Sequence, residues 1–556
     1  MRNITRVVLL VLLASMLVGA FGISGAQEAK VLYVANIGQD DIPHLDPGLA
    51  EDVASIQILE ATYVGLTTLN EVTVTVEPGI ATEWSVSDDG LVYTFSLMQN
   101  VPWVVYNTDS GAVEEVKDAD GNVRYVTAND FVYGIKRTLD PNTAGPYAYV
   151  LAPWIVGGAE YNGGSGSADD VAVAALDDYT LQITAPKATP FLANIYGMWM
   201  ALAQPQWVID EMGDAWADEG TFQSYGPYAL KEWAHDESLT LIKNPFWPGT
   251  DYVGQAKIDE IVFLLLEQSA KLAEYEAGNL DFMDDLPTAD LDRIRVEYPN
   301  EFTVSPSSCS YGYGFNTEKE PVNDARVRRA LSMAIDRQAI TDNILKAGQI
   351  PAGFYMLPNL TAAPSQEDYP DLAIKYDPEA AKAELQAYLD EKGISVDELP
   401  PITYMTNETD LHKSIIEAIQ NMWRETLGVE VQITFQEFGV FLDTRKNDAP
   451  QIFRYGWCYD YPDAHNFSGE LFRSDSTQND PNWVNPEYDA LVDQALTEND
   501  PDVRRELYAQ AEYLLVNQDA AMAPIYYYVE TQLTKPNVER TLSVIGRERF
   551  EKWDIK

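Results

Sequence analysis

Several short segments of the chain have the residue pattern of β-strands. Residues 31–35 are apolar, and residues 91–97 and 180–184 alternate between apolar and polar. An Asp-Gly dipeptide directly before residue 91 is a typical hairpin turn. Residues 258–266 are too apolar to have a solvent face, which predicts a central strand.

Apolar residues at helical spacing predict helices over 131–138 and 410–427, and another directly after Asn323-Asp324. Asn129-Asp130 is expected to cap the first helix, and Asn323 or Asp324 the amphipathic one. A strand over 429–435 follows the 410–427 helix, so strand–helix–strand order predicts a mixed α/β architecture.

The first 26 residues have the composition of a secretory signal peptide. Arg2 and Arg6 precede an apolar run over 7–23, and small residues lead to a cleavage point before Gln27. An uncleaved membrane anchor is the alternative, because such a run is near the lower length limit for a span. No cysteine follows the run, so a lipid anchor is not expected. The sequence predicts an exported, periplasmic or extracytoplasmic protein.

The net charge of the chain excludes some classes of binding partner. The 556 residues include 37 Lys and Arg against 87 Asp and Glu, a formal net charge of −50. This excess excludes a general nucleic-acid binder and disfavours binding to anionic lipid, because both need a basic face. It fits a soluble protein with a solvated acidic shell.

The cysteine count and the sequence motifs limit the metal sites and the catalytic mechanisms that the chain can have. Cys309 and Cys458 are the only cysteines, and an even count in an exported protein predicts one disulfide, with two separate buried thiols as the alternative. The cysteines and four histidines have no zinc spacing, so neither a metal nor another cofactor is expected. Phosphate-loop, zinc-protease and serine-hydrolase motifs are absent, but the many acids leave an acid-pair hydrolase open.

A series of ordered blocks resembles the periplasmic oligopeptide-binding proteins, which are family 5 extracellular solute-binding proteins of ABC importers. The resemblance extends over nearly the whole mature chain. Its blocks are His44-Leu-Asp-Pro47, residues 125–133 with 140–147, 277–281, 309–337, 407–413, 441–445, 456–460 and 526–529. It implies an α/β, two-lobed periplasmic-binding-protein-like fold of the large class with an extra domain, with the ligand buried between the lobes. The implied division is 27–63, 205–308 and 528–556 for lobe I, 64–204 for the extra domain II and 309–527 for lobe III.

The resemblance also assigns roles to single residues. Asp460 stands where the family pairs a carboxylate with the peptide α-amino group, a charge-assisted bond; a surface-turn aspartate is the alternative. Main-chain contacts to an extended peptide are implied at Val53, Gly456 and Cys458. Glu51 matches an acid of the cleft. Tyr147 and Trp457 match its aromatic walls, with ordinary core packing as the alternative.

Three cationic positions match those that receive the peptide carboxylate, namely His412, Arg445 and Arg454. Arginine suits this role because its planar fork binds a carboxylate bidentately. The alternatives are salt bridges to other acids for the arginines and a helix-surface position for His412. Phe438 replaces a family tryptophan and Asp52 a family glycine. Residues 101–127 are longer than the usual family turn, and no function is assigned to them.

These observations predict a non-enzymatic receptor. It would capture short peptides, act as a monomer and deliver its ligand to membrane permease subunits served by separate ATPases. One alternative stays in the family with a non-peptide ligand, namely a sugar, a nickel chelate or an opine. Acidic and cationic candidates together favour a zwitterion. The other alternative is a secreted hydrolase.

Overall fold

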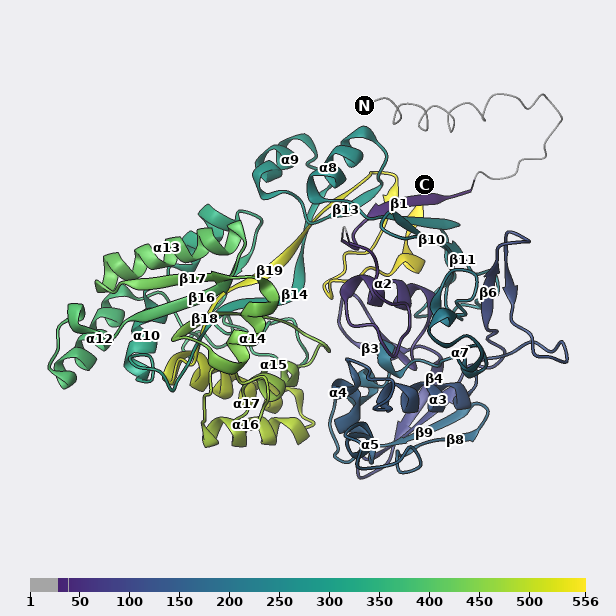
Figure 1. Cartoon of the computed structure of the whole chain (residues 1–556), viewed down its shortest axis with the longest axis horizontal. Helices are drawn as coiled ribbons and strands as arrows, with labels where there is room; N and C mark the ends of the chain where they lie inside the picture. Colours follow the sequence, from purple (N-terminus) through teal and green to yellow (C-terminus); the bar gives the residue numbers. More distant parts are fainter. Residues whose placement is uncertain (1–28, 39) are drawn as a thin grey trace.

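The computed structural model describes residues 29–38 and 40–556 (Figure 1). The expected signal peptide, 1–26, lies outside these residues. Among them, no helix combines the length and the apolar character that a membrane crossing requires.

One large sheet runs through the molecule and has eleven strands. Along the sheet their order is β10 (Tyr228–Ala234), β11 (Ser238–Lys243), β12 (Glu260–Leu264), β1 (Val31–Ala35), β13 (Phe282–Asp284), β19 (Met522–Thr534), β14 (Phe302–Phe315), β18 (Ile452–Cys458), β16 (Ile402–Asn407) and β17 (Val431–Gln436), with β15 (Ile350–Pro351) beside β19.

Two of these strands connect two lobes. The distal lobe, which we define as Tyr311 to Tyr527, holds two hydrophobic cores of its own. The proximal lobe is the chain before β14 together with the tail after β19. The chain passes between the lobes through β14 and returns through β19, and these strands pair antiparallel, with a shift in register between Pro306 and Ser310. Figure 1 shows both strands running between the lobes.

The proximal lobe packs smaller sheets and helices around a main core, with smaller clusters beside it. A four-stranded sheet has the order β4 (Ala81–Val86), β5 (Val92–Leu97), β9 (Thr180–Thr184) and β8 (Val173–Asp177). Three two-stranded ladders pair β2 (Thr67–Leu69) with β3 (Val76–Pro78), β6 (Val104–Asn107) with β7 (Ala112–Glu115), and β20 (Val538–Glu539) with β21 (Asp554–Ile555). Helices α2 (Val53–Thr62) and α3 (Ala128–Leu139) join the core, as do Phe550 and Trp553 of the C-terminal tail.

The distal lobe covers both faces of its part of the sheet. Alternate residues of β18 point to opposite faces, so Ile452 enters one core while Phe453 and Tyr455 enter the other. The first core holds α10 (Ala325–Met333), α12 (Pro378–Lys392) and α13 (Asp410–Leu427). The second holds α14 (Phe438–Asp448), α15 (Ala464–Phe472), α16 (Pro486–Thr497) and α17 (Pro501–Tyr513).

Most local predictions are confirmed. The 410–427 helix has the predicted ends, and Asp324 caps α10. The cap of α3 differs from the prediction. The helix begins at Ala128 after Thr127, because the carboxylate of Asp130 reaches back to accept the Thr127 N–H at 2.8 Å. β12 is internal in the sheet as predicted, but alternate residues stay half-buried, so one face is more open than expected.

Candidate functional site

Most of β18 has one unpaired edge. Its whole length pairs with β14, from Cys458 opposite Cys309 to Ile452 opposite Phe315. On the other side β16 pairs only with Ile452 and Phe453. Residues 454–458 therefore have no neighbouring strand on that side among the described residues. Alternate residues of an antiparallel strand direct their N–H and C=O outward, so this edge is prepared to accept another strand.

The predicted disulfide is present. Cys309 and Cys458 face each other on β14 and β18 and are covalently linked, with a sequence separation of 149. The bond fixes the end of β18 from which the chain continues to Asp460.

Asp460 lies at the boundary between the lobes and is only 9% exposed. Two proximal-lobe tyrosines contact it, because Tyr147 donates its hydroxyl to Oδ1 at 3.2 Å and Tyr149 donates to Oδ2 at 3.4 Å. Within the distal lobe, Nδ2 of Asn466 donates to Oδ2 at 3.2 Å. The carboxylate is thus surrounded by neutral donors of both lobes.

Burial raises the pKa of Asp460, while hydrogen bonds from Asn466 and the two tyrosines act in the opposite direction. Arg547 contributes a weaker, longer-range attraction. No Lys or Arg in the described part of the chain forms an ion pair with Asp460. A buried carboxylate without a cation is a suitable receptor for an ammonium group.

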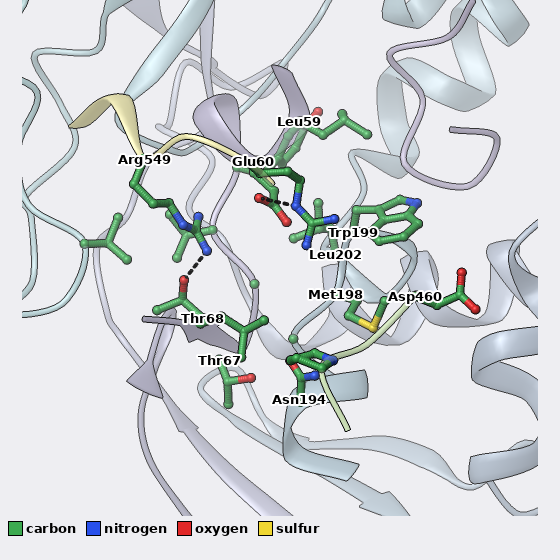
Figure 2. A pocket seen from close by; sticks show the side chains of 18 residues that line it. Leu59, Glu60, Thr67, Thr68, Asn194, Met198, Trp199, Leu202, Asp460 and Arg549 are labelled. Carbon is green, nitrogen blue, oxygen red and sulfur yellow. Dashed lines mark hydrogen bonds and ion pairs between the residues drawn. The ribbon is translucent and has the colours of Figure 1, made fainter. Parts of the chain in front are cut away.

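A small cavity of about 40 Å³ adjoins Asp460. Glu60 and Arg547 form an ion pair at 3.2 Å in its wall, and Arg549 donates to Oγ1 of Thr68 at 2.7 Å. Figure 2 shows Asp460 at the rim with its carboxylate pointing away from Glu60. The cavity has room for water beside polar partners.

Of the two predicted arginines, Arg454 forms no ion pair in the described part of the chain. Its guanidinium carbon lies 5.4 Å from the ring centroid of Phe441 and 6.0 Å from that of Tyr311. Its Nε has no hydrogen-bond partner. The absent side chain of Gly456 leaves room for this group, since a Cβ there would lie 2.9 Å from Nη1 of Arg454.

Arg445 differs from Arg454. Its Nε lies 2.7 Å from Oδ2 of Asp480, and the two side chains are 12% and 4% exposed. The salt bridge that was the alternative for this residue is therefore present.

His412 is neutral at neutral pH. It lies buried at the start of α13, with Nδ1 at 3.4 Å from the hydroxyl of Tyr311. Burial, together with the nearby charge of Arg454, lowers its pKa to about 4. It can donate or accept a hydrogen bond at this wall, but it adds no charge.

The proximal lobe contributes the beginning of α2. Val53 is 65% exposed at the first helical position, where the backbone N–H has no partner within the helix. Asp52 caps the helix by accepting the N–H of Ser55 at 2.8 Å, which gives the replacement of a family glycine a local reason. Glu51 precedes the cap and is exposed.

The structure also shows the contacts of the predicted aromatic residues. Tyr147 packs against Trp199 with ring centroids 4.9 Å apart, while Trp457 donates to Oδ1 of Asn466 at 2.9 Å. Trp457 thereby holds the same Asn466 that contacts Asp460. Phe438 is exposed at the start of α14.

Three residues with contacts in the site were not predicted from the sequence, namely Tyr149, Asn466 and Asp480. Tyr149 was within reach of pattern reasoning, since it lies two residues after Tyr147. Asn466 lies on α15, and its contacts with Asp460 and Trp457 depend on how this helix packs beside the end of β18. Asp480 carries no local signal, because its contact with Arg445 depends on the packing of a distant loop.

Two α/β lobes joined by two strands, with a buried carboxylate at their boundary, define a binding protein of the two-lobed periplasmic class. The chain belongs to the bacterial extracellular solute-binding proteins of family 5, since residues 75–479 match the family described as Bacterial extracellular solute-binding proteins, family 5 Middle.

Several known proteins are similar to this chain in sequence and in fold. The chain is 32% identical to the periplasmic oligopeptide-binding protein OppA of Salmonella typhimurium, over 92% of this chain and 90% of that protein. The unliganded open form of the periplasmic murein tripeptide-binding protein MppA matches with a TM-score of 0.78 and 28% identity, covering 95% of this chain and 98% of that one. Haemophilus influenzae OppA in complex with the peptide RPPGFSPFR matches with a TM-score of 0.72 and 26% identity, covering 96% and 100%.

Proposed function

We propose that this protein is the extracytoplasmic receptor of an ABC importer and binds short peptides by their backbone and their two termini. The observation that carries the proposal is the unpaired edge of β18, which lies between Asp460 and Arg454. An extended peptide added to this edge would gain main-chain hydrogen bonds whatever its side chains are. Gly456 and Cys458 are the main-chain partners on β18, and Val53 is the partner on α2.

Charge sets the direction of the peptide. Its ammonium group would bind the carboxylate of Asp460, and its carboxylate would bind the guanidinium of Arg454. Four residue steps of extended strand lead from Arg454 to Cys458, a distance of about 13 Å. A ligand held at both ends is therefore a peptide of a few residues. His412 adds a neutral hydrogen-bonding group beside Arg454.

Lobe closure completes the site in this proposal. Tyr147 and Tyr149 of the proximal lobe already contact Asp460 of the distal lobe. Glu51 and Trp457 would line the ligand from either side. Hinge motion at β14 and β19 would bring the lobes together around a bound peptide. The division into lobe I, the extra domain II and lobe III is part of this proposal.

The receptor works with other chains. The family consists of binding proteins, and we propose no reaction on the peptide. Delivery would pass the ligand to membrane permease subunits, with energy supplied by separate ATPase subunits. We further propose that residues 1–26 direct export of the protein and that it acts as a monomer.

Native mass spectrometry of the purified mature protein tests it. We expect co-purified ligands that form a series of masses from short peptides of mixed sequence. After unfolding and refolding to remove them, added free peptides should restore the complex and raise the melting temperature. A peptide at 100 times its dissociation constant stabilises the fold by about 2.7 kcal/mol. A single sugar or metal chelate in place of peptides would contradict the proposal, as would hydrolysis of the added peptides.

A further inference from the structure

We propose that Asp480 determines which peptide lengths this receptor accepts, because it neutralises Arg445 and leaves Arg454 to receive the peptide carboxylate. The inference rests on the proposed function and specifies its substrates. Arg445 lies on α14 and Arg454 on β18, and only the first has a carboxylate partner among the described residues.

The two arginines flank one aromatic ring. The guanidinium carbon of Arg445 lies 5.8 Å from the ring centroid of Phe441, and that of Arg454 lies 5.4 Å from the same centroid. The two guanidinium groups are therefore no more than about 11 Å apart. An extended peptide advances about 3.4 Å per residue, so the two cations correspond to ligands that differ by up to about three residues.

Asp480 is held firmly beside Arg445. Its loop is fixed by Thr317, which donates its backbone N–H to the Pro481 carbonyl at 2.9 Å and its hydroxyl to that of Asn482 at 2.9 Å. All these residues belong to the distal lobe. Closure of the lobes therefore does not separate the pair.

A peptide carboxylate would gain little binding energy from Arg445. The charges of Arg445 and Asp480 cancel, and both side chains are mostly buried. A peptide carboxylate at Arg445 would meet the like charge of Asp480, which disfavours it. Arg454 has no ion-pair partner of this kind among residues 29–38 and 40–556.

Alanine peptides from two to six residues, with free or amidated carboxyl ends, provide the probe. Calorimetry on the ligand-stripped full-length mature protein should give a preferred length for the wild type. Asp480→Asn should increase affinity at least 10-fold for one or more other lengths. Amidated peptides should show no such gain. Glu384→Gln breaks another distal-lobe ion pair, to Arg329, and should leave the length preference unchanged.

The double variant Arg445→Gln/Asp480→Asn removes both charges and serves if Asp480→Asn does not fold. It should keep the wild-type length preference, because Arg445 contributes nothing to wild-type binding in this proposal. A loss of 10-fold or more on the preferred peptide would overturn the inference. A folded Asp480→Asn protein with the wild-type preference would overturn it as well, while the proposed function would stand. A wild type that binds no peptide would instead overturn the proposed function.

Discussion

The hydroxyl of Tyr147 donates a hydrogen bond to Oδ1 of Asp460 at 3.2 Å, across the boundary between the lobes and 313 residues along the chain. Tyr149 supplies a second hydroxyl to the other carboxylate oxygen. Neutral donors orient the carboxylate but leave its charge uncompensated. A ligand ammonium can therefore join this cluster without displacing a protein cation.

Removing the charge of Asp460 should weaken peptide binding. We expect Asp460→Asn to lose about 30-fold or more in affinity, because truncating one side of a desolvated charge pair costs about 2 kcal/mol or more. Calorimetry with a free tripeptide measures the loss. An N-acetylated tripeptide, which lacks the ammonium, should bind both proteins equally weakly. Asp448→Asn, at an exposed distal-lobe carboxylate, is the matched control. Equal affinity of the Asp460→Asn and wild-type proteins for the free tripeptide would remove Asp460 from the site.

A single methyl group at position 456 should disturb Arg454. The added Cβ would lie 2.9 Å from Nη1, so the guanidinium must move from its place over Phe441. We expect Gly456→Ala to weaken binding of free peptides about 10-fold with little change in the free energy of unfolding. Gly254→Ala, where a Cβ meets nothing within 4 Å, is the control. Unchanged peptide affinity after Gly456→Ala would show that the position of Arg454 does not matter for the ligand.

Loss of the disulfide should affect stability more than binding. The bond closes a loop with a sequence separation of 149 residues, and the chain-entropy model assigns such a loop up to about 5 kcal/mol. We expect Cys309→Ser/Cys458→Ser to lower the free energy of unfolding by about 2–5 kcal/mol, measured by denaturant titration. The β14–β18 ladder still places the strand edge, so peptide affinity at 25 °C should fall less than 10-fold. A larger loss of affinity would mean that the covalent bond itself shapes the site.

A buried glutamate makes stability depend on pH. Glu512 is 1% exposed and accepts the backbone N–H of Tyr355 at 2.7 Å. Burial raises its pKa from 4.5 to about 7. Its protonated form is therefore favoured by folding, so its contribution is fully present below pH 4.5 and is lost as the pH rises toward 7.

Glu512→Gln should remove this dependence. Relative to the wild type, we expect the variant to gain roughly 3 kcal/mol between pH 4.5 and pH 8, since one pKa unit corresponds to about 1.4 kcal/mol. Denaturant unfolding across this range measures the difference. Glu506→Gln, on the exposed side of α17, should match the wild type at every pH. Parallel wild-type and Glu512→Gln profiles would show that this carboxyl titrates normally.

Local periodicity predicted the elements whose signals lie within a few residues. The 410–427 helix and strands β1, β5 and β9 are examples. The two connecting strands were not predicted, because β14 contains Pro, Ser and Gly and pairs with residues more than 200 positions away. Such pairings depend on the whole fold rather than on local propensity.

The residues of the candidate site likewise divide into those that the sequence predicted and those that depend on the whole fold. The resemblance to family 5 pointed to Asp460, Arg445 and Arg454 without distinguishing the two arginines. The distinction comes from Asp480, whose loop is packed beside Arg445 by contacts that no sequence window contains. The Thr127 cap was missed for a simpler reason, because Asn129 and Asp130 are themselves common caps and lie two and three residues away.

The C-terminal tail has a consequence for how the molecule is made. Phe550 and Trp553 are fully buried in the proximal lobe, and Asp554 forms an ion pair with Lys30 near the other end of the described chain. The proximal lobe, which also holds the start of the described chain, therefore lacks part of its interior until Phe550 and Trp553 are in place. The distal lobe is continuous in sequence and has its own cores, so it can acquire its structure earlier. A chain truncated before Phe550 would therefore carry an intact distal lobe on an unfinished proximal lobe.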